Sequence, residues 1–161
     1  MPSLMRYINI VSRCASIWRT DKLEGTELGD QHYSYILVVC RRPGISQDAI
    51  SRRLFINKSN VTRSLAYLED HGFVTRERDS EDRRQTLVYP TEKALEILPK
   101  VREIIKGWNS YITEGFTEEE MEMYMAMTER IAARAAEYAK LSSDAYTDLD
   151  GAAKPKKEEG E

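Results

Sequence analysis

Two short helical stretches set close together constrain the fold more than any other feature of the sequence. Ser46 is placed to cap a helix over residues 47–54, and Asn57 is placed to cap a second helix that runs to about Asp70. The second helix ends before Gly72, because glycine readily adopts the positive φ angle that a helix exit commonly requires. Helices joined by so tight a segment turn against each other, which predicts a helix-turn-helix unit.

The sequence pattern changes from helical to strand-like directly after this pair. Residues 73–78 and 84–89 are rich in strand-forming side chains and lie on either side of a polar turn, residues 79–83. This order predicts a β hairpin. The expected fold class is therefore mostly α with a small β hairpin, in the form of a winged helix-turn-helix.

Apolar residues recur at steps of three and four along residues 4–20, which predicts a first helix with one stripe for burial. The stripe consists of Leu4, Tyr7, Val11, Cys14 and Trp18. A polar connector then leads to an apolar helix over residues 30–42, which Pro43 and Gly44 close.

Two further helices are expected after the hairpin. Thr91 opens the fifth helix, and Pro99 is expected to kink or interrupt it. Thr117 and Glu120 form a capping box at the start of the sixth. The apolar stripe of the sixth helix consists of Met121, Tyr124, Thr128, Ile131, Ala135 and Tyr138.

Charge is unevenly distributed along the chain. Residues 41–90 hold ten basic and seven acidic side chains, a balance of +3, whereas the formal net charge of the whole chain is −3, so the remainder carries −6. A basic middle between acidic ends fits contact with nucleic acid, although an evenly solvated surface would give the same count. The arrangement of the side chains has to decide between the two.

The outer face of the second helix of the pair is rich in hydrogen-bonding groups. At about 100° per residue, Val61, Leu65 and Leu68 share the face that points to the core. The opposite face presents Ser59, Asn60, Arg63 and Tyr67. These groups bind base edges and phosphates, and the second helix of such a unit enters the major groove. An exposed polar face with no partner is the alternative for this helix alone.

Arginines gather around the predicted turn of the hairpin, at Arg76, Arg78, Arg83 and Arg84. A purely structural hairpin needs no such concentration of cations, whereas a charged wing tip suits phosphate or the minor groove. Asp82 precedes Arg84 by two residues and is expected to orient its guanidinium group.

Four segments of the chain form a recognisable signature. They are Gly44-Ile-Ser-Gln-Asp-Ala-Ile50, Asn57-Lys-Ser-Asn-Val-Thr-Arg63, Leu68-Glu-Asp-His-Gly-Phe-Val-Thr-Arg76 and Asp82-Arg-Arg84. At these spacings they resemble the multiple antibiotic resistance regulators, the MarR family, and the resemblance extends from about residue 4 to 141. It implies a winged-helix homodimer whose first and last helices form the interface, and which usually represses promoters and releases DNA when a small ligand binds.

By position, the resemblance places Ser59, Asn60, Thr62 and Arg63 in the groove, with Arg83 and Arg84 on the wing. The full set of candidate contacts to double-stranded DNA is Ser46, Gln47, Lys58, Ser59, Asn60, Thr62, Arg63, Tyr67, Arg76, Arg78, Asp82, Arg83 and Arg84. The expected function is that of a sequence-specific transcriptional regulator, acting as a repressor rather than an activator.

A second copy of the chain is also expected from the size of the unit. One helix-turn-helix contacts few base pairs, whereas two copies related by a twofold axis read a pseudo-palindrome with half-sites roughly 10 base pairs apart. The candidate dimer interface is formed by the apolar stripes of the first and the sixth helix. Its residues are Leu4, Tyr7, Val11, Met121, Tyr124, Thr128, Ile131, Ala135 and Tyr138. Packing of both stripes within one subunit is the alternative.

These expectations divide the chain into four parts. They are an N-terminal dimerisation helix and connector (1–29), a winged helix-turn-helix DNA-binding domain (30–90), C-terminal dimerisation helices (91–141) and a disordered acidic tail (142–161).

Three aromatic side chains, Trp18, His32 and Tyr35, are candidates for a pocket that holds a small aromatic or anionic effector, although helix packing explains them equally well. Cys14 lies on the apolar stripe, which favours a buried and inert thiol over a redox sensor. Cys40 receives the same interpretation.

Other classes of function find little support in the sequence. We find no phosphate loop, nucleophile elbow, metal motif or convincing triad, so neither an enzyme nor a bound cofactor or metal is expected. The longest apolar run is too short to span a bilayer, and no secretory signal is evident, which favours the cytoplasm. A winged helix that binds protein remains an alternative, because a fold does not fix a function.

Overall fold

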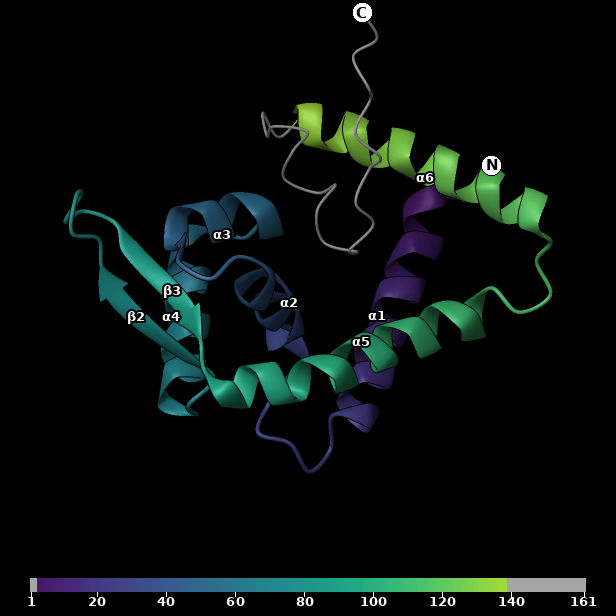
Figure 1. Cartoon of the computed structure of the whole chain (residues 1–161). Helices are drawn as coiled ribbons and strands as arrows, with labels where there is room; N and C mark the ends of the chain where they lie inside the picture. Colours follow the sequence, from purple (N-terminus) through teal and green to yellow (C-terminus); the bar gives the residue numbers. More distant parts are fainter. Residues whose placement is uncertain (1–2, 139–161) are drawn as a thin grey trace, which may run out of the picture.

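The computed structural model describes residues 3–138, so the tail predicted at 142–161 lies outside the described residues. The described part of the chain is helical apart from one small sheet (Figure 1). The elements are α1 (Leu4–Lys22), η1 (Asp30–His32), α2 (Tyr33–Arg41), β1 (Ile45–Ser46), α3 (Gln47–Leu54), α4 (Lys58–Asp70), β2 (Val74–Arg78), β3 (Thr86–Pro90), α5 (Glu92–Ile112) and α6 (Glu118–Tyr138). The predicted fold class, mostly α with a winged helix-turn-helix, is confirmed.

Side-chain caps fix where the helix pair begins. The Ser46 hydroxyl accepts a hydrogen bond from the N–H of Ala49 at 3.2 Å, and the Asn57 carbonyl accepts one from the N–H of Asn60 at 2.9 Å. Phe55 makes the turn between α3 and α4 in the left-handed conformation, with φ of 55°. The two helices are thereby held at a fixed angle to each other.

The sheet has three strands in the order β1-β3-β2, all antiparallel. The hairpin β2–β3 was predicted, with the second strand starting at Thr86 rather than at residue 84. Strand β1 was not predicted, because two residues are too few to show a periodic pattern. Its Ile45 pairs with Val88, which ties the start of α3 to the wing.

The core of the reading head, defined as α2–β3, is formed where the helix pair meets the sheet. Its largest fully buried side chains include Ile36, Ile50, Leu65, Leu68, Phe73 and Val88. Every apolar position on the inner face of α4 is buried, as the helix periodicity predicted. This packing fixes which face of α4 remains outside.

Helix α5 runs from Glu92 to Ile112 with Pro99 inside it, so of the two expected effects of Pro99, a kink or an interruption, the interruption does not occur. Proline removes one main-chain donor, but Ala94 on one side and Val101 and Ile104 on the other are all buried. Packing of both halves against the core holds the helix together across the missing hydrogen bond.

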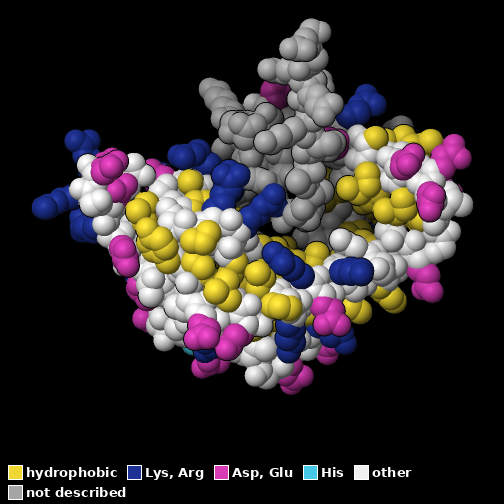
Figure 2. All heavy atoms as spheres, viewed as in Figure 1, with side chains coloured by type: hydrophobic (Ala, Val, Ile, Leu, Met, Phe, Trp, Pro, Cys, Tyr) yellow, Lys and Arg dark blue, Asp and Glu magenta, His cyan; other side chains and the backbone are white. Residues whose placement is uncertain are grey.

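The outward faces of α1 and α6 are apolar and uncovered in the single chain. Leu4, Tyr7 and Val11 are 56%, 55% and 44% exposed, and Tyr124 and Ile131 on α6 are also exposed. Figure 2 shows hydrophobic side chains gathered over α6, on the side of the molecule away from the wing. Packing of these stripes within one subunit is therefore wrong. The expected burial of Cys14 within the chain is wrong for the same reason, since it is exposed.

Across residues 3–138, no helix combines the length and the apolar character that a membrane crossing requires.

Candidate nucleic-acid interface

The N-terminal half of α4 carries the predicted reading face. Ser59, Thr62 and Arg63 are exposed and Asn60 is half-buried, while Val61 beside them is buried. The buried side of the helix packs on the core, so the polar side has to face outward. The helix geometry predicted from the sequence therefore holds for these residues, and their contacts to DNA stay a prediction.

Several of these side chains already make hydrogen bonds within the chain. The Arg63 guanidinium donates to the Asn60 side-chain oxygen. Lys58 lies 2.8 Å from Asp48 of α3, and the Thr62 hydroxyl donates to the main-chain oxygen of Lys58 at 2.9 Å. Exposed pairs of this kind contribute little stability, about 0 to 1 kcal/mol, so a phosphate or base edge can replace them at low cost.

The start of α3 lies at the same surface as β1. Ser46 uses its oxygen as the cap acceptor, which leaves its hydroxyl proton able to donate. Gln47 follows it in the first turn and is half-buried.

The base of the wing is joined to α4 by an ion pair. Glu69 accepts hydrogen bonds from the main-chain N–H of Arg76 at 3.1 Å and from its guanidinium Nε at 2.9 Å. The hydrogen bond from Arg76 holds the pKa of the Glu69 carboxyl below its usual range. Arg76 thus positions the wing from within the chain.

The tip of the wing presents the remaining cations. Arg83 and Arg84 are exposed, and Arg78 donates from its guanidinium to the main-chain oxygen of Arg83 at 3.2 Å. Figure 2 shows basic side chains projecting at this end of the molecule. Asp82 accepts from the main-chain N–H of Arg84 at 3.1 Å, so the expectation that it orients the Arg84 guanidinium is wrong. It shapes the turn because a short acceptor side chain reaches the N–H two residues ahead.

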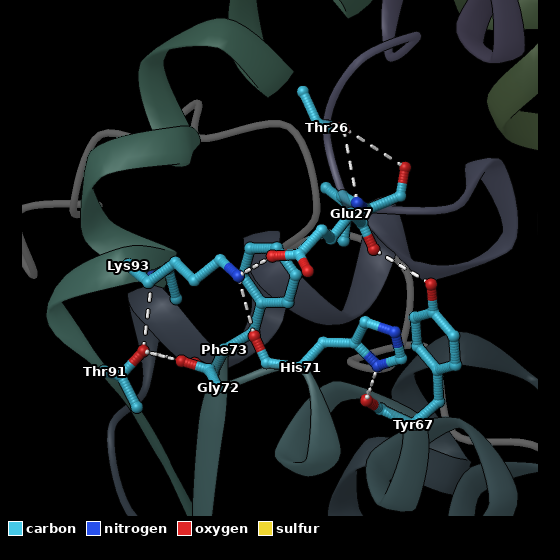
Figure 3. A network of polar contacts seen from close by, with 10 residues as sticks. Thr26, Glu27, Tyr67, His71, Gly72, Phe73, Thr91 and Lys93 are labelled. Atoms are coloured by element: carbon cyan, nitrogen blue, oxygen red, sulfur yellow. Dashed lines mark hydrogen bonds and ion pairs between the residues drawn. The ribbon is translucent and has the colours of Figure 1, made fainter.

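Tyr67 lies toward the C-terminal end of α4 and is held inside the chain. Its hydroxyl donates to the main-chain oxygen of Glu27 at 2.9 Å (Figure 3). Its ring stacks on both histidines, with centroids 4.4 Å from His32 and 3.8 Å from His71. The sequence had assigned Tyr67 to the outer face and gave no sign of the stack on His32, because that partner comes from a different element; His71 lies four residues on, at the end of the same helix.

A polar network joins the connector, the exit of α4 and the start of α5 (Figure 3). Lys93 of α5 bonds the carboxylate of Glu27 and donates to the main-chain oxygen of His71 at 2.8 Å. The hydrogen bond from Lys93 lowers the pKa of the Glu27 carboxyl. Thr91 donates to the main-chain oxygen of Gly72 at 2.6 Å. This network holds the reading head against the long helix.

A pocket of about 560 Å³ lies between η1–α2 and α4. It is lined by Gln31, His32, Tyr35, Ile56, Asn60, Arg63, Ser64 and Tyr67. His32 and Tyr35 are only 3% and 1% exposed, and His32 Nδ1 and the Tyr35 hydroxyl have no hydrogen-bond partner within the described chain. Burial raises the pKa of the Tyr35 hydroxyl and lowers that of His32.

Trp18 does not join His32 and Tyr35 at this pocket. It stacks on Tyr111 with centroids 5.7 Å apart, and its indole N–H donates to the main-chain oxygen of Ile104 at 3.1 Å. Of the three predicted effector residues, His32 and Tyr35 therefore line the pocket together, whereas Trp18 takes part in the packing of α1 against α5.

Cys40 is half-buried, and burial raises the pKa of its thiol to about 11, which keeps it protonated and unreactive. Among residues 3–138 no cluster of three or more potential metal ligands occurs.

Known proteins share both the sequence pattern and the fold. The chain is 24% identical over 131 residues to the HTH-type transcriptional regulator YybA of Bacillus subtilis, which covers 81% of this chain and 87% of YybA. The crystal structure of MarR superposes with a TM-score of 0.76 and 28% identity over 86% of this chain and 94% of that chain. Residues 26–85 match the family model described as MarR family. Over this segment the chain is similar to the MarR family.

The segment that matches the MarR family model runs from the connector through α2, the helix pair, β2 and the turn of the wing, and ends just before β3. The fold likeness reaches further, into α1, α5 and α6. A MarR family structure from Listeria monocytogenes, solved in complex with a 26mer DNA, superposes with a TM-score of 0.80 at 22% identity, over 85% of this chain and 91% of that chain. The relatives of this chain are transcriptional regulators, which are generally not enzymes.

Proposed function

We propose that the chain is a sequence-specific, double-stranded-DNA-binding transcriptional regulator that acts as a homodimer in the cytoplasm. The observation that carries this proposal is the outward face of α4, where Ser59, Asn60 and Arg63 stand on a helix whose other side is fixed in the core. Short polar groups and a guanidinium at the start of a recognition helix suit base edges in the major groove. The Listeria relative was solved with a 26mer DNA, which supports the same partner here.

The wing supplies the second part of the contact. Arg83 and Arg84 project from its tip, and Arg76 and Arg78 are fixed by bonds within the chain. A cation at a wing tip neutralises phosphate or enters the minor groove without reading a base. The helix would thus supply sequence preference and the wing would supply affinity for any duplex.

The dimer is supported by the apolar faces that a single chain leaves uncovered. Exposed aromatic and aliphatic side chains line α1 and α6, including Tyr7, Val11, Tyr124 and Ile131. Contiguous apolar surface of this kind usually marks an interface. A twofold axis through these helices would present two reading heads to two half-sites of a pseudo-palindromic operator.

The position of the pocket supports the proposal that the chain represses and is released by an effector. Asn60 and Arg63 line it from the reading side, and His32 and Tyr35 supply buried polar atoms without partners. A small aromatic or anionic compound that bonds these atoms would prefer one arrangement of the recognition helix. Its binding would shift the dimer away from the arrangement that fits DNA, in proportion to the difference in affinity. Bound at a promoter, the dimer would block transcription.

A protein-binding winged helix is less well supported, because such a surface needs apolar anchors at the outer positions of α4. The outer residues Ser59, Asn60 and Arg63 are polar or charged.

The test is a selection from random duplex DNA with the purified full-length chain at about 0.15 M salt, a salt concentration that must be fixed because phosphate contacts depend on it. Enrichment of an inverted repeat, with two subunits per duplex in sedimentation, would support the regulator. Recovery of no preferred sequence, with only weak salt-sensitive binding, would contradict it.

A further inference from the structure

We propose that Tyr67 is a positioning residue for DNA reading, and that His32, which stacks on it, makes the orientation of the recognition helix sensitive to protons. This inference rests on the proposed DNA-binding function. It adds a means of regulation that involves no ligand, and it gives Tyr67 a role inside the chain in place of a base contact.

The stack uses both histidines that the chain contains. The Tyr67 ring lies between them, at 15° to the ring of His32 and at 22° to the ring of His71. His32 comes from η1, whereas His71 caps the end of α4 and its Nδ1 lies 2.8 Å from the main-chain oxygen of Tyr67. One aromatic side chain of the recognition helix is thus held from two directions.

The stack joins the recognition helix to the parts of the chain that carry the predicted dimer interface. The Tyr67 hydroxyl bonds the main chain of Glu27, whose side chain bonds Lys93 of α5, and Lys93 also bonds the main chain of His71 (Figure 3). The connector that holds Glu27 continues directly from α1. A change in the stack therefore changes how α4 sits relative to α1 and α5.

The stack accommodates a neutral His32 better than a charged one. Its Nδ1 is buried without a partner, and a Cβ at Gly29 would lie 3.2 Å from it, so main chain closes that edge of the ring. A proton added there would have no acceptor within the described chain. Burial and, to a lesser extent, the charge of His71 lower the pKa of His32.

Within residues 3–138, the two carboxylates near His32 are both engaged elsewhere. Asp30 beside it accepts from Ser16 at 2.5 Å and pairs with Arg19 of α1, and Glu27 pairs with Lys93. The titratable and charged groups around His32 on the packed elements are Arg19, Glu27, Asp30, Tyr35, Arg63, Tyr67, His71 and Lys93. Of these, the charge of His71 disfavours a further positive charge on His32.

The sign of the effect follows from the direction of the shift. A histidine whose pKa is lowered in the stack binds fewer protons there than when the stack is open. The stack is therefore fully favoured above about pH 6.5, the ordinary pKa of histidine, and is weakened as the pH falls below that value. Acidification should then loosen α4 and reduce DNA affinity. General electrostatics predicts the opposite, because acid makes a protein more positive and favours binding to phosphate.

The experiment measures the Kd for the duplex enriched in the selection above, at constant ionic strength, at pH 7.5 and at pH 5.5. The parent should lose affinity over this range, by at most about tenfold for one coupled proton. In His32→Phe the ring can still stack but cannot take up a proton. Its ratio of affinities at the two pH values should stay within about twofold, whatever its affinity at pH 7.5.

Tyr67→Phe is the matched variant, because it keeps the stacked ring and removes only the hydroxyl bond to Glu27. It should bind more weakly at both pH values and keep the pH response of the parent. Parent affinity that is unchanged or rises in acid would overturn the proposal. So would a response in His32→Phe equal to that of the parent.

A second measurement separates this inference from the proposed function. NMR of protein labelled only at histidine follows two resonances without any DNA. The pKa of His32 should lie below its ordinary range in the parent, and Tyr67→Leu should return it toward that range. If the pKa of His32 is the same in Tyr67→Leu as in the parent, the role given to the stack is wrong. Absence of DNA binding at every pH would instead overturn the proposed function, and with it the reading role given to Tyr67.

Discussion

Glu69 of the recognition helix binds Arg76 of the first wing strand through both the main-chain N–H and the guanidinium group of the arginine. The pair spans seven residues and crosses from helix to sheet, so the wing cannot pivot freely at its base. The two parts of the proposed DNA contact therefore keep a constant separation.

Replacing Glu69 by glutamine should lower the free energy of unfolding by about 1 kcal/mol at pH 7, since the charge-assisted bond is lost and the pair is only partly buried. The pKa of Glu69 is lowered by Arg76, so the stability it contributes is present above the ordinary glutamate value and is lost as the pH falls through the lowered one. Urea unfolding of both proteins at pH 7 and pH 3.5 measures this. A difference between them that is as large at pH 3.5 as at pH 7 would contradict the assignment.

Arg63→Ala and Arg83→Ala should affect DNA binding differently. Loss of Arg63 should cost about 1 to 3 kcal/mol on the preferred sequence and relax the sequence preference, because a base contact is removed. Loss of Arg83 should weaken binding to all sequences and reduce the salt slope by about 1, because a phosphate contact is removed. Titrations at several salt concentrations measure both.

Lys106→Ala is the control for this pair, because Lys106 is an exposed cation on α5, outside the reading head. If Arg63→Ala and Arg83→Ala both bind as this control does, the assignment of the two arginines is wrong.

Charge placed on the apolar stripe should dissociate the dimer. Val11→Asp and Ile131→Asp each put a carboxylate on a face that is apolar and exposed in the single chain. Burying an unpaired charge in an interface costs several kcal/mol, so both variants should sediment as monomers and bind a full operator much more weakly. Lys106→Asp, which alters charge at an exposed polar position, should remain dimeric. Dimers of unchanged stability in both stripe variants would remove these helices from the interface.

Tyr35→Phe removes a buried hydroxyl that has no hydrogen-bond partner within the described chain. The unfolding free energy of the ligand-free protein should change by no more than about 1 kcal/mol, because the hydroxyl is buried and its polar neighbour Ser64 interacts with it only weakly. If this hydroxyl holds the effector, the variant should also need more benzoate, used as a small aromatic anion, to release the operator duplex. Thermal unfolding and competition titrations give the two results. Equal release by benzoate in both proteins would exclude the hydroxyl from the effector site.

Much of the fold could be predicted from local signals. Caps at Ser46 and Asn57 and the apolar spacing of Val61, Leu65 and Leu68 act over one or two turns, and each is present as predicted. Where the sequence misled, a contact between distant residues decided the result. Pro99 looked like a helix breaker, but burial on both sides of it outweighs one lost hydrogen bond.

The candidate site divides in the same way. The outward residues of α4 followed from helix geometry, whereas the stack around Tyr67 depends on His32, thirty-five positions earlier. Asp82 was assigned to the Arg84 side chain, but the nearer main-chain N–H competes for its carboxylate. Periodicity places a side chain on a face of an element, and it does not say which element packs against that face.

The two-residue strand β1 makes the helix pair and the hairpin a single rigid body, because it ends where α3 begins and pairs with the central strand of the sheet. The conformational entropy of arranging a helix and a wing around a duplex is therefore lost during folding, before any DNA is present. A preorganised surface of this kind binds with less ordering of its own backbone, so more of each contact appears as affinity. The motion that remains available for regulation is then movement of the whole reading head relative to the long helices α1, α5 and α6.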